Sequence, residues 1–306
     1  MTGKNATEVV AADGAGIARA AQVLRYGGLV AVPTETVYGL AARADSAEAV
    51  GRIYAAKGRP GFNPLIVHVR GLVQARALAR FDSVATALAE AHWPGPLTLV
   101  LPRREDAALA PAVTAGLRTL ALRVPAHPAM RALLEAVDFP LAAPSANPSG
   151  FISPTTAQHV LASLEGRLDL VLDGGACAAG LESTIVAVRE GGNVEVLRPG
   201  PIDLGRHLPG GGLIEAPGQL ASHYAPGKPV RLGAVAARPD EFLIGFGAIA
   251  GDCTLSASGD VDEAAARLYA CLHEAARALH PRIAVAPVPD TGLGRAINDR
   301  LRRAAA

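Results

Sequence analysis

Small polar side chains follow apolar runs of this sequence at the points where buried strands would end. The stretch PTETVYGL (33–40) has three hydroxyls and a carboxylate directly after an apolar run. In APSANPSG (143–150), Ser145, Asn147 and Ser149 alternate with small residues and proline. Small side chains let a ligand approach the backbone, while hydroxyl and amide groups supply directional hydrogen bonds. Both stretches are typical of a pocket floor; an ordinary solvated turn is the alternative interpretation.

Cationic side chains occur at the ends of other expected elements. Lys57 lies three residues after Tyr54 and continues the inward-facing side of an expected helix, and Arg59 follows just past its end. One interpretation is that both cations complement the negative end of the helix dipole. The other is a phosphate clamp, in which a lysine point charge lies beside an arginine fork. With Arg123 and Arg198 at strand ends, these residues predict a site for a nucleotide or another anion.

Several common catalytic and cofactor motifs are absent from the sequence. It contains no G-x-x-x-x-G-K-[ST] loop, no G-x-S-x-G elbow, and no histidine or cysteine pair at metal-ligand spacing. Gly245-Phe-Gly247 has only the start of a dinucleotide fingerprint, so we expect a turn there. Cys177, Cys253 and Cys271 are odd in number and far apart. They predict buried thiols in a reducing cytoplasm and no metal site formed by the protein.

The charge and hydropathy of the chain exclude two broad classes. Lys and Arg total 29 and Asp and Glu total 28, so the formal net charge is +1. A nearly neutral chain does not bind polyanions with its whole surface, although a local basic face is still compatible with this charge. An RNA-binding module with a basic concave surface is therefore the alternative function. No apolar run approaches the ~20 residues of a membrane-spanning helix, and the first residues lack an apolar signal region.

Helical and extended patterns alternate over the first two thirds of the chain, which predicts an α/β fold. An Asp45–Glu48 capping box and a Ser153-Pro154 start are expected to begin two of the helices. The last three strands of this part, near 168–198, have no helix between them, which predicts a twisted, mixed sheet rather than a purely parallel one. The other expected strands are 29–32, 65–69, 97–101, 119–124 and 140–144, and the helices lie near 17–26, 48–57, 72–80, 83–91, 127–136 and 154–164.

A Gly- and Pro-dense segment separates this part from the end of the chain. Residues 207–230 break both helix and strand, so we expect a domain at 1–208, a linker at 209–229 and a second domain at 230–306. The second domain has the pattern of a β-α-β unit, with a strand at 241–247, a helix at 262–279 and a strand at 282–288.

Taken in order, these motifs resemble the YrdC/Sua5 family of threonylcarbamoyl-AMP synthases. The family's K-x-R…S-x-N signature falls on Lys57, Arg59, Ser145 and Asn147, and SHYAPGKPV (222–230) is similar to the tyrosine-bearing linker of its two-domain branch. The other matching stretches are PTETVYGL, FNPLIVHV, WPGPLTLVL, LALRVPAHP, LDGG, ESTIV, LRPG and, at the end, GLGRAINDRLRRAA. The resemblance implies a twisted α/β domain with a central cationic cavity and a small Rossmann-like C-terminal domain.

The resemblance also implies a reaction and its site. L-Threonine, bicarbonate and ATP with Mg²⁺ would give L-threonylcarbamoyladenylate and pyrophosphate. A tRNA threonylcarbamoyl transferase would take this product for tRNA modification, with weak tRNA contact at most. A carbamoyl-transfer domain of the hydrogenase-maturation type is disfavoured, because no zinc-finger or acylphosphatase-like segment is present. The implied threonine contacts are Thr36, His68, Arg123 and Ser183, and the implied ATP contacts are Lys57, Arg59, Asn63, Thr119, Ala143, Ser145, Ser153, Arg198 and Tyr224, with Asn147 in support.

Overall fold

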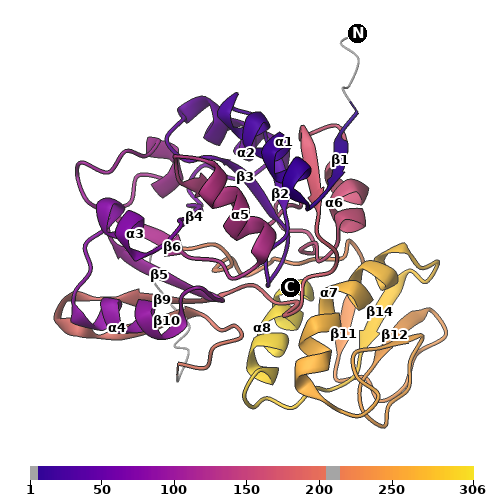
Figure 1. Cartoon of the computed structure of the whole chain (residues 1–306). Helices are drawn as coiled ribbons and strands as arrows, with labels where there is room; N and C mark the ends of the chain where they lie inside the picture. Colours follow the sequence, from indigo (N-terminus) through magenta and orange to yellow (C-terminus); the bar gives the residue numbers. More distant parts are fainter. Residues whose placement is uncertain (1–5, 205–213) are drawn as a thin grey trace.

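The computed structural model describes residues 6–204 and 214–306 of the chain. Their strands form a ten-stranded sheet and a separate four-stranded sheet, each covered by helices (Figure 1). The predicted α/β class is confirmed. The expected boundary at residues 208 and 209 lies outside the described residues, so the proposed domain limits stay a prediction at that point.

The large sheet is mixed, as predicted. Its strand order is β1-β8-β2-β3-β7-β4-β6-β5-β9-β10. The pairs β1/β8, β2/β8, β4/β6 and β5/β9 are parallel, whereas β2/β3, β3/β7, β4/β7, β5/β6 and β9/β10 are antiparallel. The strands are β1 (Glu8–Ala11), β2 (Val30–Val32), β3 (Gly39–Arg43), β4 (Ile66–His68), β5 (Leu97–Pro102), β6 (Thr119–Arg123), β7 (Leu141–Ala142), β8 (Leu170–Asp173), β9 (Thr184–Val188) and β10 (Val194–Arg198).

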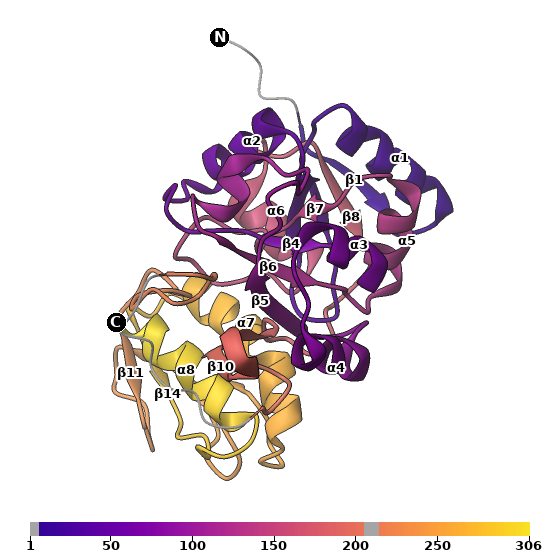
Figure 2. The same cartoon turned by 90° about the vertical axis from the view of Figure 1, so that its left-hand side faces the viewer.

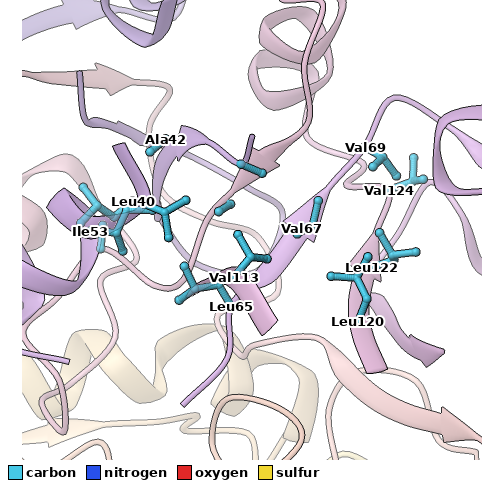
Figure 3. Packing of buried hydrophobic residues seen from close by; sticks show 14 of the residues in the cluster. Leu40, Ala42, Ile53, Leu65, Val67, Val69, Val113, Leu120, Leu122 and Val124 are labelled. Atoms are coloured by element: carbon cyan, nitrogen blue, oxygen red, sulfur yellow. The ribbon is translucent and has the colours of Figure 1, made fainter. Parts of the chain in front are cut away.

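Amphipathic helices cover this sheet and bury its apolar side chains. Leu40 of β3, Ile53 of α2 and Leu122 of β6 are fully buried in one cluster. In Figure 3, Leu40 and Ile53 lie side by side and Leu122 lies farther along the cluster. Burial of such aliphatic side chains contributes about 1.5–3 kcal/mol each relative to exposure. The helices are α1 (Gly14–Arg25), α2 (Ala47–Lys57), α3 (Leu72–Leu78), α4 (Ser83–His92), α5 (Pro128–Ala136) and α6 (Ala157–Leu164), with short 3-10 turns η1 (Pro111–Thr114) and η2 (Glu190–Gly192).

The C-terminal part has a fully parallel sheet in the order β11-β14-β12-β13. Its predicted β-α-β unit is confirmed as β12, α7 and β14. The two helices lie on the side of the small sheet that faces the large one (Figures 1 and 2). The elements are β11 (Val230–Leu232), β12 (Glu241–Gly245), β13 (Cys253–Thr254), α7 (Val261–Arg277), β14 (Arg282–Val285) and α8 (Gly294–Ala304).

One apolar cluster joins the two parts of the molecule. Leu268 and Leu272 of α7 and Leu301 of α8 are buried in the same cluster as Ile152 and Leu181, which precede α6 and β9. The C-terminal part is therefore packed against the large sheet's loops rather than separated from them by solvent.

The structure corrects both predicted helix starts. Ser46, not Asp45, caps α2 by accepting a hydrogen bond from the Ala49 amide, because the Asp45 carboxylate is paired with Arg43 at 2.7 Å. Likewise, Thr156 caps α6 at its start. Ser153 lies three residues earlier, and its hydroxyl is bonded to a carboxylate instead.

Candidate functional site

A pocket lies at the ends of β2, β4, β6, β7 and β10, where the segment 214–224 covers them. Nine of the predicted site residues line this pocket: Thr36, Arg59, His68, Arg123, Ala143, Ser145, Ser183, Arg198 and Tyr224. Glu182 also lines it, as do Pro217, Gly218 and His223 of the covering segment. The structure thus brings together residues that are up to 188 positions apart in the sequence (224 − 36).

Arg123 is held on one side of the pocket by hydrogen bonds to three different groups. Its Nη1 donates to the Thr36 hydroxyl at 3.0 Å, Nη2 to the Glu35 carboxylate at 2.6 Å, and Nε to the Gly95 carbonyl at 3.3 Å. Burial opposes the ionisation of Glu35, but the charge and hydrogen bond of Arg123 outweigh it and lower the pKa of that carboxyl. Glu35 therefore fixes a charged guanidinium beside the pocket.

His68 lies next to Arg123 in the sheet and is almost completely buried. Burial, with the nearby charge of Arg123, lowers the pKa of His68 to about 3. The imidazole is therefore neutral at pH 7, so one ring nitrogen can accept a hydrogen bond. Nδ1 of His68 has no partner among the described residues.

The end of α2 positions Lys57 and Arg59. Gly58 ends this helix with φ +59°, a left-handed conformation that glycine adopts without strain, so the chain turns sharply between the two cations. Nζ of Lys57 donates to the backbone carbonyls of Ser145 and Asn147. Burial, with the charge of Arg59, holds the pKa of Lys57 well below its usual value. Hydrogen bonds of Lys57 therefore connect the end of α2 to the loop 143–150, whose polar residues predict a pocket floor.

Arg59 reaches the pocket from just after α2, and Arg198 reaches it from the end of β10. Arg59 donates to the Asn63 side-chain oxygen at 2.6 Å, and burial lowers the pKa of Arg59 to about 10. Arg198 donates to the Ser183 carbonyl at 2.9 Å and to its hydroxyl at 3.1 Å. With a pKa of about 10, the Arg59 guanidinium stays protonated at pH 7, so the pocket wall carries positive charge here. Burial also lowers the pKa of Arg198.

Five predicted site residues do not line the pocket directly. Lys57 and Asn63 contact lining residues, as described above, and Asn147 uses its amide to donate to the carbonyls of Pro148 and Phe151. Ser153 donates to Glu182 at 2.5 Å. The Thr119 hydroxyl instead donates to the carboxylate of Glu215 at 3.4 Å, and Glu215 belongs to the covering segment.

Comparison with known proteins identifies the family of this chain. A family model described as "Telomere recombination", which covers Sua5, YciO and YrdC proteins, matches residues 22–200, more than half of the chain. A second model, described as "Threonylcarbamoyl-AMP synthase, C-terminal domain", matches residues 207–306. The chain belongs to the YrdC/Sua5 family.

Similar members of the YrdC/Sua5 family match almost end to end. The threonylcarbamoyl-AMP synthase of Bacillus subtilis is 39% identical over 322 residues, which cover 94% of this chain and 92% of the relative. That of Pyrococcus abyssi is 38% identical, covering 93% and 92%. The crystal structure of P. abyssi Sua5 complexed with L-threonine aligns with a TM-score of 0.88 at 37% identity, covering 98% of this chain and 96% of that one.

A segment of the chain itself covers the pocket of this YrdC/Sua5 protein. Its cavity volume is about 40 Å³, which holds only a few water molecules. Pro217, Gly218, His223 and Tyr224 all line it from the covering segment. A nucleotide needs more space than this, so we expect the segment to move when one binds. The large cationic cavity implied by the resemblance stays a prediction, since three arginines and one glutamate line a small space.

The polar atoms of the pocket include one further group without a partner. The Tyr224 hydroxyl is buried and makes no hydrogen bond within the described residues. Burial, with the charge of Glu182, raises the pKa of Tyr224, so its hydroxyl is a donor at pH 7. A buried donor without an acceptor costs about 1–3 kcal/mol, which a ligand oxygen would recover.

Sequence reasoning missed four groups that hold the site together. Glu35 lies within PTETVYGL, but its pairing with Arg123 cannot be read from that motif. Glu215 lies in the linker. Tyr269 and Arg300 come from α7 and α8 and contact Glu182 at 2.8 Å and 2.9 Å. Nothing near Tyr269 or Arg300 in the sequence points to the pocket, because their partner lies 87 and 118 positions away.

The described residues contain neither a cluster of metal ligands nor a helix suited to a membrane. No group of three or more His, Cys, Asp or Glu in 6–204 and 214–306 is placed to hold a metal ion. In the same ranges, no helix has the length and apolar character that crossing a bilayer requires.

Proposed function

We propose that this protein makes L-threonylcarbamoyladenylate and pyrophosphate from L-threonine, bicarbonate and ATP, which makes it a nucleotidyltransferase. The observation that carries the proposal is the convergence of the predicted threonine and nucleotide residues on one pocket, in a chain that matches threonylcarbamoyl-AMP synthases over more than nine tenths of its length.

L-Threonine would bind on the Arg123 side of the pocket. An arginine fork suits the amino-acid carboxylate, and this guanidinium already lies beside the Thr36 hydroxyl at 3.0 Å. The neutral His68 imidazole can accept a hydrogen bond from the amino or hydroxyl group of threonine. The Ser183 hydroxyl, bonded to Thr98 at 2.7 Å, is fixed in orientation and can serve as a further partner.

ATP would bind on the side where α2 and β10 end. Lys57, Arg59 and Arg198 would neutralise the charge that develops on the phosphates. Mg²⁺ would enter with ATP as part of the substrate, because no described cluster of acidic side chains could hold it alone. The remaining nucleotide contacts are assigned to Asn63, Thr119, Ala143, Ser145, Ser153 and Tyr224, with Asn147 supporting the loop.

The chemistry needs no covalent enzyme intermediate. The uncharged amine of threonine attacks CO₂ or bicarbonate and becomes a carbamate, with a proton released to solvent in the first case and water leaving in the second. A carbamate oxygen then attacks the α-phosphorus, a new P–O bond forms, and the bond to the β-phosphate breaks as pyrophosphate leaves. Positioning and charge stabilisation supply most of the rate enhancement in such phosphoryl chemistry.

The linker would act as a lid over this reaction. Carbamates and acyl-type adenylates hydrolyse in water, so closure of the segment 214–224 would protect the product. The product would then pass to a tRNA threonylcarbamoyl transferase in the cytoplasm, with at most a weak direct contact to tRNA.

The decisive experiment is a substrate-omission assay. We expect pyrophosphate release only when threonine, bicarbonate and ATP are all present, with the adenylate identified by mass spectrometry. Release that continues without threonine would contradict the proposal. The alternative, an RNA-binding module, predicts instead an affinity for RNA that falls steeply with ionic strength, which filter binding at several salt concentrations measures.

A further inference from the structure

Glu182 is a pocket carboxylate whose partners come from both parts of the molecule. It accepts hydrogen bonds from Ser153 at 2.5 Å, from the Tyr269 hydroxyl at 2.8 Å and 2.9 Å, and from Nε of Arg300 at 2.9 Å. Ser153 belongs to the large part, whereas Tyr269 and Arg300 belong to α7 and α8 of the C-terminal part. One buried carboxylate thus links the pocket wall to both C-terminal helices.

Arg300 is completely buried, with 0% of its side chain exposed. Its Nη1 donates to the Pro199 carbonyl and to Asp299, both at 2.9 Å. The guanidinium carbon also lies 5.4 Å from the centre of the Tyr224 ring, within the range of a cation–π contact. Arg300 therefore contacts the pocket carboxylate and the tyrosine of the covering segment at the same time.

A buried carboxylate beside a nucleotide site would repel the phosphates unless a cation compensates its charge. Burial would raise the pKa of Glu182, but the charges of Arg300 and Arg198 and the Ser153 hydrogen bond lower it to about 2. Without Arg300, the remaining close cation would be Arg198, which the phosphates of ATP also need. An uncompensated Glu182 would then compete with the phosphates for Arg198 and repel them directly.

We propose that Arg300 and Tyr269 are positioning residues for the nucleotide half of the site: they neutralise and orient Glu182, so that the charge of Arg198 and the Tyr224 hydroxyl are available to ATP, while Ser153 stays bonded to Glu182. The proposal rests on the function proposed above. It gives the C-terminal part a direct role in the site.

The packing around this contact supports a fixed rather than a transient arrangement. Gly180 approaches α7 so closely that a Cβ atom there would lie 2.5 Å from the backbone of Ala265 and Ala266. The Tyr224 ring also packs near the Tyr269 ring, with centroids 5.7 Å apart. The first contact holds α7 against the loop that carries Glu182, and the second holds it against the covering segment.

The test separates charge compensation from simple packing. ATP and threonine dissociation constants are measured by calorimetry, together with pyrophosphate release and thermal unfolding, for wild type, Arg300→Met, Glu182→Gln and the double variant. We expect Arg300→Met to weaken ATP binding tenfold or more and threonine binding less than threefold. Adding Glu182→Gln should restore at least a third of the lost ATP affinity, because the uncompensated charge is gone.

Matched variants make every outcome decisive. Arg302→Met changes an exposed arginine two residues along α8 and should leave both dissociation constants unchanged. Tyr269→Phe keeps the ring and removes one donor, so it tests the site even if Arg300→Met does not fold; we expect ATP binding to weaken about threefold to tenfold. Equal losses for ATP and threonine with no recovery in the double variant would assign Arg300 a packing role and overturn the inference. A wild-type protein that releases no pyrophosphate would instead refute the proposed function.

Discussion

Nη2 of Arg189 lies 2.6 Å from Oε2 of Glu215, and this ion pair ties the covering segment to the large sheet beside Thr119. The covering segment lies over a cavity of only about 40 Å³ in this arrangement. Because we expect the segment to move when ATP enters, the strength of this contact should influence how fast ATP associates. A partly exposed ion pair of this kind contributes about 0.2–1 kcal/mol.

Replacement of Glu215 should therefore speed nucleotide entry. We expect Glu215→Gln to raise the association rate constant of a fluorescent ATP analogue by about 1.5-fold to fivefold, which corresponds to that free energy. Stopped-flow fluorescence measures the rate. The matched control is Glu195→Gln, which removes another partner of the same arginine, 2.7 Å away on β10, without touching the segment. Equal rates in wild type and Glu215→Gln would show that this pair does not limit opening.

Loss of the cations at the end of α2 should abolish most of the activity. Lys57→Met and Arg59→Ala are each expected to reduce turnover about 100-fold or more, because charge that develops on the phosphates would lose a fixed partner. Pyrophosphate release at saturating substrates measures the effect. Arg52→Ala is the control on the same helix, where the arginine pairs with Asp169 at a partly exposed position. Normal turnover in Lys57→Met and Arg59→Ala would show that the phosphate assignment is wrong.

Replacement of Arg123 should weaken the binding of threonine much more than the binding of ATP. Arg123→Lys keeps the positive charge but cannot hold Thr36 and Glu35 while binding a carboxylate with two donors. We expect the dissociation constant for threonine to rise about tenfold or more and that for ATP to change by less than threefold. Calorimetric titration with each substrate alone checks this, and an equal effect on both substrates would contradict the assignment.

Acid should weaken the contact between the two parts of the molecule. The rings of His159 on α6 and His273 on α7 stack 3.9 Å apart. Burial, with the charge of Arg277, lowers the pKa of His159 to about 4; burial, with the charge of His159, lowers that of His273 to about 3. In the unfolded chain both would titrate near 6.5, so the unfolded state binds more protons between these values. The free energy of unfolding should therefore decrease as the pH falls from about 6.5 towards 4.

Urea unfolding at several pH values measures this decrease in wild type and in His159→Phe, which keeps a ring in the stack but cannot take up a proton. The variant should show a smaller slope between pH 6 and pH 4. His92→Phe, at the end of α4, is the control and should keep the wild-type slope. A His159→Phe slope that matches wild type would mean that this stack does not contribute to the acid sensitivity.

Much of the fold could be predicted because its signals are local. The run 97–101 predicts β5, and the 262–279 pattern predicts α7, since apolar spacing is visible within a few residues. The strand GLAAR (39–43) was missed because glycine and alanine carry little strand propensity, and it is specified by its pairing with β2 and β7. The helix caps failed for a related reason: the polar groups of Asp45 and Ser153 are taken by partners outside the local pattern.

In the candidate site too, residues within local motifs could be predicted and residues that act through distant partners could not. Residues within motifs, such as Arg59 and Ser145, could be singled out from type and spacing, and they line the pocket. The groups that orient them could not, because Glu35 holds Arg123 across 88 positions and Arg300 holds Glu182 across 118. Such pairs exist only once the chain has folded.

The pairing of β1 with β8 has a consequence for synthesis of the chain. Glu8 lies opposite Leu170, so the first strand to leave the ribosome must wait for residues made much later before its edge is covered. The pocket closes later still, when the segment around Tyr224 arrives. A nascent or truncated chain that stops before β8 would leave the edge of β1 open, and one that stops before the segment around Tyr224 would leave the pocket uncovered. Chaperones and proteases act upon such exposed features.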